Sequence, residues 1–138
     1  MGQLVDLIDS KAFRKHTALC IGTYEFSGVG WFLGGYSRAI CDASPDAPDD
    51  MFGFREWLHQ RFDGAGNVGW VALIQEQFGV GEEATNQFFV LFDQFRSEVE
   101  SRGIEKIIQE HAEYELRRYG ALASSTLRPG ALRRSTDI

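Results

Sequence analysis

The chain has 138 residues, of which 43% are hydrophobic and 25% are charged, and its formal net charge is −6. These values are typical of one globular domain, and no apolar run approaches the roughly 18 residues of a membrane helix. The acidic charge disfavours nucleic acid as a partner, because phosphate binding needs a concentrated basic face. Residues 1–6 lack the basic and apolar regions of a signal peptide. We therefore expect a cytoplasmic protein that does not bind a membrane.

In chain order, the first half predicts one short helix and one longer helix. Apolar residues at helical spacing run from Leu4 toward Lys15 and predict the short helix. The segment Leu19-Cys20-Ile21 comes nearest to a strand, but it is too short to be convincing. Residues 28–43 carry an apolar stripe at helical spacing, and the two prolines of residues 44–48 follow it. This stripe predicts a helix that the prolines end.

The middle of the chain is strongly aromatic. Residues 51–95 hold two of the three tryptophans and eight of the eleven phenylalanines. Their spacing predicts a helix after Asp49-Asp50, where carboxylates suit the helix dipole. It also predicts a helix that carries Trp70 and a long one from Glu82 that Gly103 ends. The aromatic density marks this region as the core, with Trp57 and Trp70 inside.

A last helix is predicted from about Ile104 to Tyr119, and the small, polar and basic residues 121–138 are predicted to form a flexible tail. We therefore expect an all-α, single-domain bundle of five or six helices over residues 1–120. Trp31 stands beside the apolar stripe of its helix, and we expect its side chain to be partly exposed.

The residues Gly64-x-Gly66-x-x-Gly69 match the dinucleotide-binding fingerprint. That motif works only between a strand and a helix, where the backbone can approach a pyrophosphate. Here the preceding residues predict a helix. We therefore interpret the glycines as a turn between two helices, with Asn67 as the N-cap of the second, and we expect no bound cofactor.

Neither metal chemistry nor catalysis is indicated by local patterns. His111 and Glu115 are four residues apart and could share a metal on one helix face, but zinc needs a third protein ligand. We interpret His111 as an exposed residue in a charged run, so no metal site is predicted. Cys20 and Cys41 are too far apart for a zinc motif and are expected to be buried, reduced thiols. No residue is predicted to be catalytic.

The negative charge is concentrated in two regions. Residues 26–50 have a net charge of −3 and residues 76–100 a net charge of −5. Such a distribution suits a basic protein partner, since complementary fields steer association. The alternative for the adjacent pairs Asp49-Asp50 and Glu82-Glu83 is helix capping. The candidate partner-binding residues are Asp42, Asp46, Asp49, Asp50, Glu76, Glu82 and Glu83.

The order of several motifs resembles a family of small bacterial immunity-type proteins encoded beside polymorphic toxins, including contact-dependent inhibition systems. The motifs that match are Leu19-Cys20-Ile21-Gly22, Phe32-Leu33-Gly34-Gly35-Tyr36-Ser37-Arg38-Ala39, Gly53-Phe54-Arg55-Glu56-Trp57, Asn67-Val68-Gly69-Trp70 and Phe88-Phe89-Val90-Leu91-Phe92-Asp93-Gln94-Phe95. In that family the first motif is an extended Tyr-Leu-Gly segment preceded by Arg-Pro. This chain departs from it, with His16-Thr17 in place of Arg-Pro and Cys20 in place of the tyrosine.

The resemblance implies a non-enzymatic protein that binds and neutralises a cognate toxin domain, one that is basic, with nucleases among the candidates. The acidic residues named above would then form the face that binds the toxin. Two alternatives stay open on the sequence. One is a structural or regulatory helical protein that associates with itself, and the other is a small ligand-binding protein or enzyme that uses the Gly64–Gly69 turn.

Overall fold

The structure is a computed structural model that describes residues 2–64 and 66–126, with side chains up to residue 120. All regular secondary structure in these ranges is helical, which confirms the all-α class. The helices of the described residues number eight rather than five or six: α1 (Gln3–Asp9), α2 (Lys11–Lys15), α3 (Thr17–Ile21), α4 (Phe26–Ala43), α5 (Phe54–Phe62), α6 (Trp70–Phe78), α7 (Glu82–Arg102) and α8 (Ile104–Thr126).

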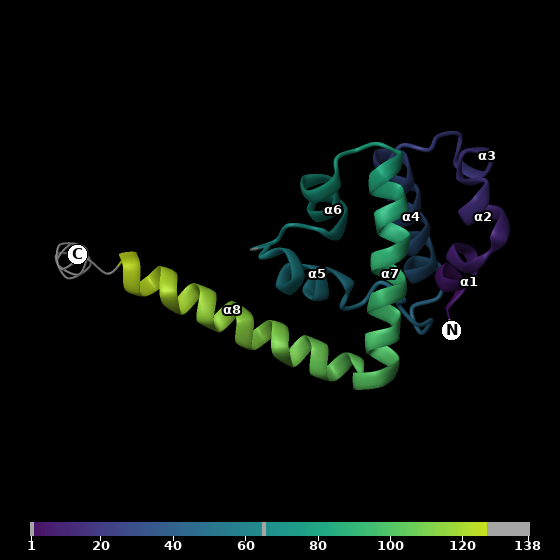
Figure 1. Ribbon diagram of the computed structural model, residues 1–138. Coiled ribbons are helices and arrows are strands. Elements are labelled where there is room, and N and C mark those ends of the chain that lie inside the picture. The colour runs from purple at the N-terminus through teal and green to yellow at the C-terminus, as the bar shows by residue number, and fades with distance from the viewer. Residues whose placement is uncertain (1, 65, 127–138) are drawn as a thin grey trace.

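Helix α7 is the centre of the bundle. In Figure 1 it crosses in front of α4, with α5 and α6 on one side and α1, α2 and α3 on the other. The starts of α4 and α7 lie together, because Thr85 Oγ1 donates to the Tyr24 carbonyl at 3.0 Å and the Phe26 N–H donates to the Val80 carbonyl at 2.7 Å. The two helices therefore run in the same direction along the core.

The core is aromatic, as the sequence predicted, and Phe54 lies at its centre. This ring is fully buried and contacts five others at centroid distances of 5.3–6.1 Å. Its neighbours are Trp57, Trp70, Phe88, Phe92 and Phe95. Trp57 is 5% exposed and its indole N–H donates to Glu98 at 3.0 Å, whereas Trp70 is only half-buried.

The additional helices lie in the first 21 residues. The predicted helix from Leu4 to Lys15 is broken at Ser10, whose side chain accepts the Phe13 N–H and caps α2. The segment that came nearest to a strand is helix α3, which Gly22 closes in the left-handed conformation. The extended segment of the immunity-type family is therefore absent at residues 19–22. A side-chain cap and a closing glycine stabilise such short helices.

Two expected helix starts are displaced toward glycines. Helix α5 begins at Phe54 rather than after Asp49-Asp50, and its N-cap, Gly53, has a φ of 88° that strongly favours glycine. Helix α6 is preceded by Gly69 as N-cap rather than by Asn67. The Gly64–Gly69 segment does lie between two helices, as we interpreted it, so no strand precedes it.

Helix α8 follows α7 after one residue, Gly103, and turns sharply back past α5 (Figure 1). Its first part packs on α5 and α7, where Ile107 is buried, and its far part extends away from the bundle. The helical backbone continues to Thr126, past the expected boundary at residue 120. Residues 127–138 of the predicted flexible tail lie outside the described residues.

Candidate functional site

The seven candidate acidic residues fall into two groups along the chain. Asp42, Asp46, Asp49 and Asp50 belong to the end of α4 and the connection to α5, here called the α4–α5 acidic group. Glu76, Glu82 and Glu83 belong to α6 and the start of α7, here called the α6–α7 acidic group. Asp49 and Asp50 of the first group line a pocket with Val99 and Glu100, at the opposite end of α7 from Glu82 and Glu83 of the second. At 1.5 Å per residue, about 25 Å of helix separates them.

Within the α4–α5 acidic group, three carboxylates already have intramolecular roles. Asp50 accepts the backbone N–H groups of Gly2 at 3.2 Å and Val5 at 2.9 Å, so it caps α1. Capping was the right alternative for Asp50, but the helix is α1 rather than the one that follows it. Asp49 accepts the Met51 N–H at 3.1 Å, and Asp42 pairs with Arg38 at 3.1 Å on the surface.

The remaining four acidic residues are exposed and form no ion pair within the part of the chain that the structure describes. Glu82 and Glu83 lie in the first turn of α7, where their charge favours the helix dipole. Glu83 also accepts a hydrogen bond from Gln87 at 3.1 Å. Asp46 and Glu76 face solvent. Their charges are therefore available to a partner.

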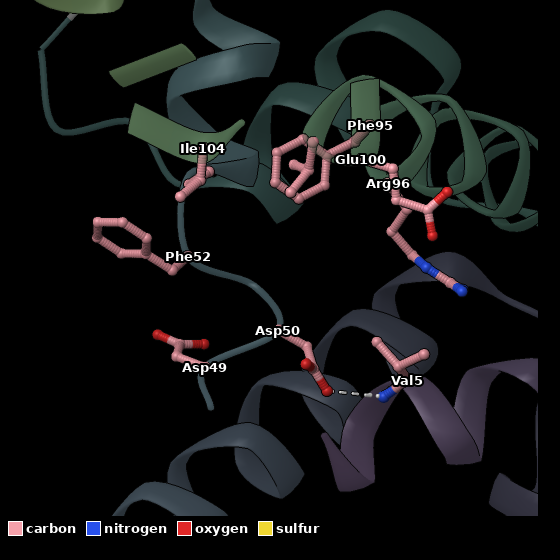
Figure 2. Close-up of a pocket in the computed structure, with 9 residues that line it drawn as sticks. Val5, Asp49, Asp50, Phe52, Phe95, Arg96, Glu100 and Ile104 are labelled. Atoms are coloured by element: carbon pink, nitrogen blue, oxygen red, sulfur yellow. Dashed lines mark hydrogen bonds between the residues drawn. The ribbon is translucent and has the colours of Figure 1, made fainter. Parts of the chain in front are cut away.

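A pocket of about 280 Å³ lies against the α4–α5 acidic group. Figure 2 shows Phe52, Phe95 and Ile104 on one side, with the carboxylates of Asp49 and Asp50 nearby. Val5, Arg96, Val99 and Glu100 complete the lining. The Phe52 side chain is 56% exposed. The sequence did not reveal this pocket, because its walls come from α1, α7, α8 and the α4–α5 connection.

A separate ion-pair network connects the N-terminal helices to α7. Arg14 donates two hydrogen bonds to Asp93, at 2.8 and 2.7 Å, and Asp9 accepts from Arg14 at 3.3 Å and from Arg96 at 2.7 Å. The hydrogen bonds and charge of Arg14 lower the pKa of Asp93. The guanidinium of Arg14 also lies 5.0 Å from the centre of the Phe89 ring. This network holds α2 on α7, and no feature of it indicates catalysis.

Two large apolar side chains on α3 and α4 are exposed. Trp31, whose side chain we expected to be partly exposed, is 78% exposed, and Leu19 is 83% exposed. Cys20 and Cys41 are exposed rather than buried and form no disulfide. The predicted burial of the cysteines was wrong, because Cys20 lies on the outer side of a surface helix and Cys41 lies beside the solvent-facing pair Arg38–Asp42.

The prediction for His111 was also wrong. This residue is 6% exposed and lies against the fully buried His59 of α5, with a ring-centroid distance of 5.5 Å. Burial lowers the pKa of His111. Because His59 also lies near Glu115, three residues with metal-binding side chains meet between α5 and α8. The contact joins residues far apart in sequence, so spacing alone could not reveal it.

In the described residues, no helix is both long enough and apolar enough to cross a membrane. No protein-family model matches the chain, and comparisons with curated proteins and with solved structures gave no significant match. The resemblance to immunity-type proteins therefore stays a prediction.

Proposed function

We propose that the chain is an immunity-type protein that binds and neutralises a basic bacterial toxin domain through the α4–α5 acidic group and the pocket beside it. The observation that carries this proposal is the combination of carboxylates and exposed apolar surface at one place. Asp49, Asp50 and Glu100 line a pocket that also presents Phe52, and among the described residues that line it Arg96 is the one cation. The net charge of −6 and the motif resemblance support a basic protein as the partner.

A lysine or arginine side chain of the toxin has the right chemistry for this pocket. Its aliphatic part can pack on Phe52 and Ile104 while its charged end reaches the carboxylates. An anchor of this kind in a desolvated pocket contributes most of the energy of many interfaces. The pocket is small, so it would receive one side chain within a larger contact surface.

The α6–α7 acidic group would have a different role. It lies about 25 Å along α7 from the pocket, too far to contact the same side chain. Its exposed carboxylates would instead add to the long-range negative field that raises the association rate. The proposal therefore assigns the anchoring contact to one end of α7 and electrostatic steering to the other.

Two charge reversals separate these roles. Asp46→Lys with Asp49→Lys alters the pocket end, and Glu82→Lys with Glu83→Lys alters the other end, so the two variants carry the same net charge. Asp50 is kept because it caps α1. Each variant would be coexpressed with the C-terminal domain of a secreted toxin encoded directly upstream, and growth and binding kinetics measured.

The pocket-end variant should lose protection through a faster dissociation rate. The other variant should retain protection and associate more slowly at low salt, with the difference shrinking at high salt. Circular dichroism and urea unfolding would establish that both variants fold. Full protection by the folded pocket-end variant would refute the proposal.

Self-association is a second candidate, because Trp31 and Leu19 are large apolar side chains with 78% and 83% exposure. Tryptophan is among the residues that contribute most energy at protein contacts. Light scattering of the wild type and of Trp31→Ser would test it. A concentration-dependent dimer that the substitution dissociates would favour this candidate.

A further inference from the structure

The contact between α5 and α8 contains two histidines and a carboxylate. His59 is fully buried, His111 has 8% of its side chain exposed, and Glu115 has 35% exposed. One ligand atom from each residue lies within 4.8 Å of one from each of the others. The spacing of His111 and Glu115 by four residues places both on the same face of α8, and that face meets His59 on α5.

The hydrogen bond of His59 determines which of its nitrogens carries the proton. Nε2 lies 2.8 Å from the Val68 carbonyl oxygen. A carbonyl can only accept, so Nε2 carries the hydrogen and the neutral ring keeps a lone pair on Nδ1. Nδ1 is buried and has no hydrogen-bond partner. The ring is therefore held in the tautomer that presents one unused lone pair.

His111 supplies a second unused nitrogen. Its Nε2 is also buried without a hydrogen-bond partner, and the nearest carboxylate oxygen of Glu115 is 3.6 Å away, longer than a normal hydrogen bond. Buried polar atoms without partners are uncommon, and here two of them belong to rings in contact, one of which lies beside a carboxylate.

We propose that His59 Nδ1, His111 Nε2 and the Glu115 carboxylate form a Zn²⁺ site between α5 and α8. Two imidazoles and one carboxylate are a ligand set that zinc accepts, with a fourth position for water or for a group from a partner. The hydrogen bond from His59 to the Val68 carbonyl is the outer contact that metal-binding histidines usually make. The exposed part of Glu115 provides the route by which the ion enters.

The distances allow this site after small side-chain movements. Tetrahedral zinc with bonds of about 2.0–2.1 Å brings its ligand atoms to roughly 3.3 Å from one another. The His111–Glu115 pair at 3.6 Å is close to that value. The other pairs of ligand atoms lie within 4.8 Å, and the partly exposed Glu115 side chain has rotatable bonds that allow it to move toward the histidines. Zinc would then link the part of α8 around His111 and Glu115 to α5.

Two arrangements without a metal ion lead to different expectations. The rings of His59 and His111 meet edge to face at 74°, which is also an ordinary aromatic contact. A buried water could bridge the two unpaired nitrogens. Neither arrangement requires the negative charge of Glu115, so a variant of this residue distinguishes them from the zinc site.

The test uses the full chain without an affinity tag. It is made both as the wild type and as a double variant with Cys20→Ser and Cys41→Ser, which is the parent for the variants below. Both cysteines are exposed, and thiolates bind zinc, so their removal eliminates that source. Titration with ZnSO₄ in a calorimeter should give one ion per chain. Zinc should also raise the Tm, because an ion that binds only the folded state stabilises it. Cobalt should give the absorption of a tetrahedral complex.

Glu115→Gln is the decisive variant, since it removes the charge while keeping shape and helix propensity. It should weaken zinc binding at least tenfold and leave the fold unchanged by circular dichroism. His111→Leu should abolish binding. The matched controls, Glu113→Gln on the exposed side of α8 and His16→Gln on the surface, should bind zinc as tightly as the parent.

Either of two results would overturn the site. One is the absence of zinc binding and of a zinc-dependent rise in Tm for the parent chain. The other is equal zinc affinity in the parent and in folded Glu115→Gln, which would assign the binding to other groups.

Discussion

The aromatic core around Phe54 and the contact between α5 and α8 are both buried, but they differ in whether their buried polar atoms have hydrogen-bond partners. In the core, five rings surround Phe54, and the buried indole N–H of Trp57 has a carboxylate partner. In the α5–α8 contact, His59 and His111 are equally well buried, yet each keeps a ring nitrogen without a partner.

The comparison shows that burial alone does not identify a structural residue. Apolar rings in a close-packed interior need no further explanation. Two buried imidazole nitrogens without partners cost free energy, which the apolar rings of the core do not. The chain therefore has one region whose packing is complete and one where two buried nitrogens have no partner, which is the basis of the proposed zinc site.

The largest effect is expected from Phe54→Ala in the core. Removing a fully buried ring with five aromatic neighbours leaves a cavity and should lower the free energy of unfolding by about 3–5 kcal/mol. Urea unfolding followed by circular dichroism measures this change. Phe52→Ala is the control, because that side chain is 56% exposed and its loss should cost far less. Similar losses at the two positions would contradict the assignment of Phe54 to the core centre.

A smaller effect is expected from Asp50→Ala, which removes the partly buried carboxylate that caps α1. Two backbone N–H groups at the start of α1 would lose their acceptor, and the free energy of unfolding should fall by about 1 kcal/mol. Hydrogen exchange should accelerate first in α1. Asp46→Ala, four residues earlier on the exposed connection, should change neither measurement. Unchanged exchange in α1 would show that Asp50 is no cap.

The α5–α8 contact should respond to substitution in the opposite direction from the core. In metal-free protein, His111→Leu removes an unpaired nitrogen and introduces a residue with higher helix propensity. The free energy of unfolding should stay the same or rise by up to about 1 kcal/mol. Urea unfolding with EDTA present would measure it. A loss comparable with that of Phe54→Ala would mean that His111 is a packing residue like those of the core.

The smallest effect concerns pH. Burial lowers the pKa of His111 in the folded chain, whereas the unfolded value is about 6.5. As pH falls below about 6.5, the unfolded chain binds a proton at this residue that the folded chain resists, so stability falls. With EDTA present, the stability of His111→Leu relative to the wild type should be greater at pH 5 than at pH 8, by less than about 1 kcal/mol. Equal differences at both pH values would contradict the burial effect.

The sequence predicted the helices that have a long apolar stripe. Helix α7 begins at Glu82 and ends before Gly103 as expected, because its stripe and its terminal residues agree. Helices α1, α2 and α3 were harder to predict, since five to seven residues contain too few turns to show a period. Their existence depends on local caps such as Ser10 and on tertiary contacts such as Asp50.

The sequence could predict only those parts of the candidate sites whose residues are close together in the chain. Acidic residues could be found by counting, but their division into two groups depends on the parallel packing of α4 and α7. Similarly, His111 and Glu115 share a helix and were recognised as a pair, whereas His59 reaches them only through the packing of α5 on α8. Spacing within one element gave two ligands, and the third required the fold.

The three tryptophans have a further consequence, because each is a fluorophore in a different environment. Trp31 faces solvent, Trp70 is half-buried and Trp57 lies inside, with Arg61 4.9 Å from its ring centre. Emission from Trp31 should be red-shifted and accessible to iodide, while that from Trp57 should be shielded. The unmodified chain thus contains two fluorescent reporters. Trp31 reports binding at the surface of α4, and Trp57 reports whether the interior is intact.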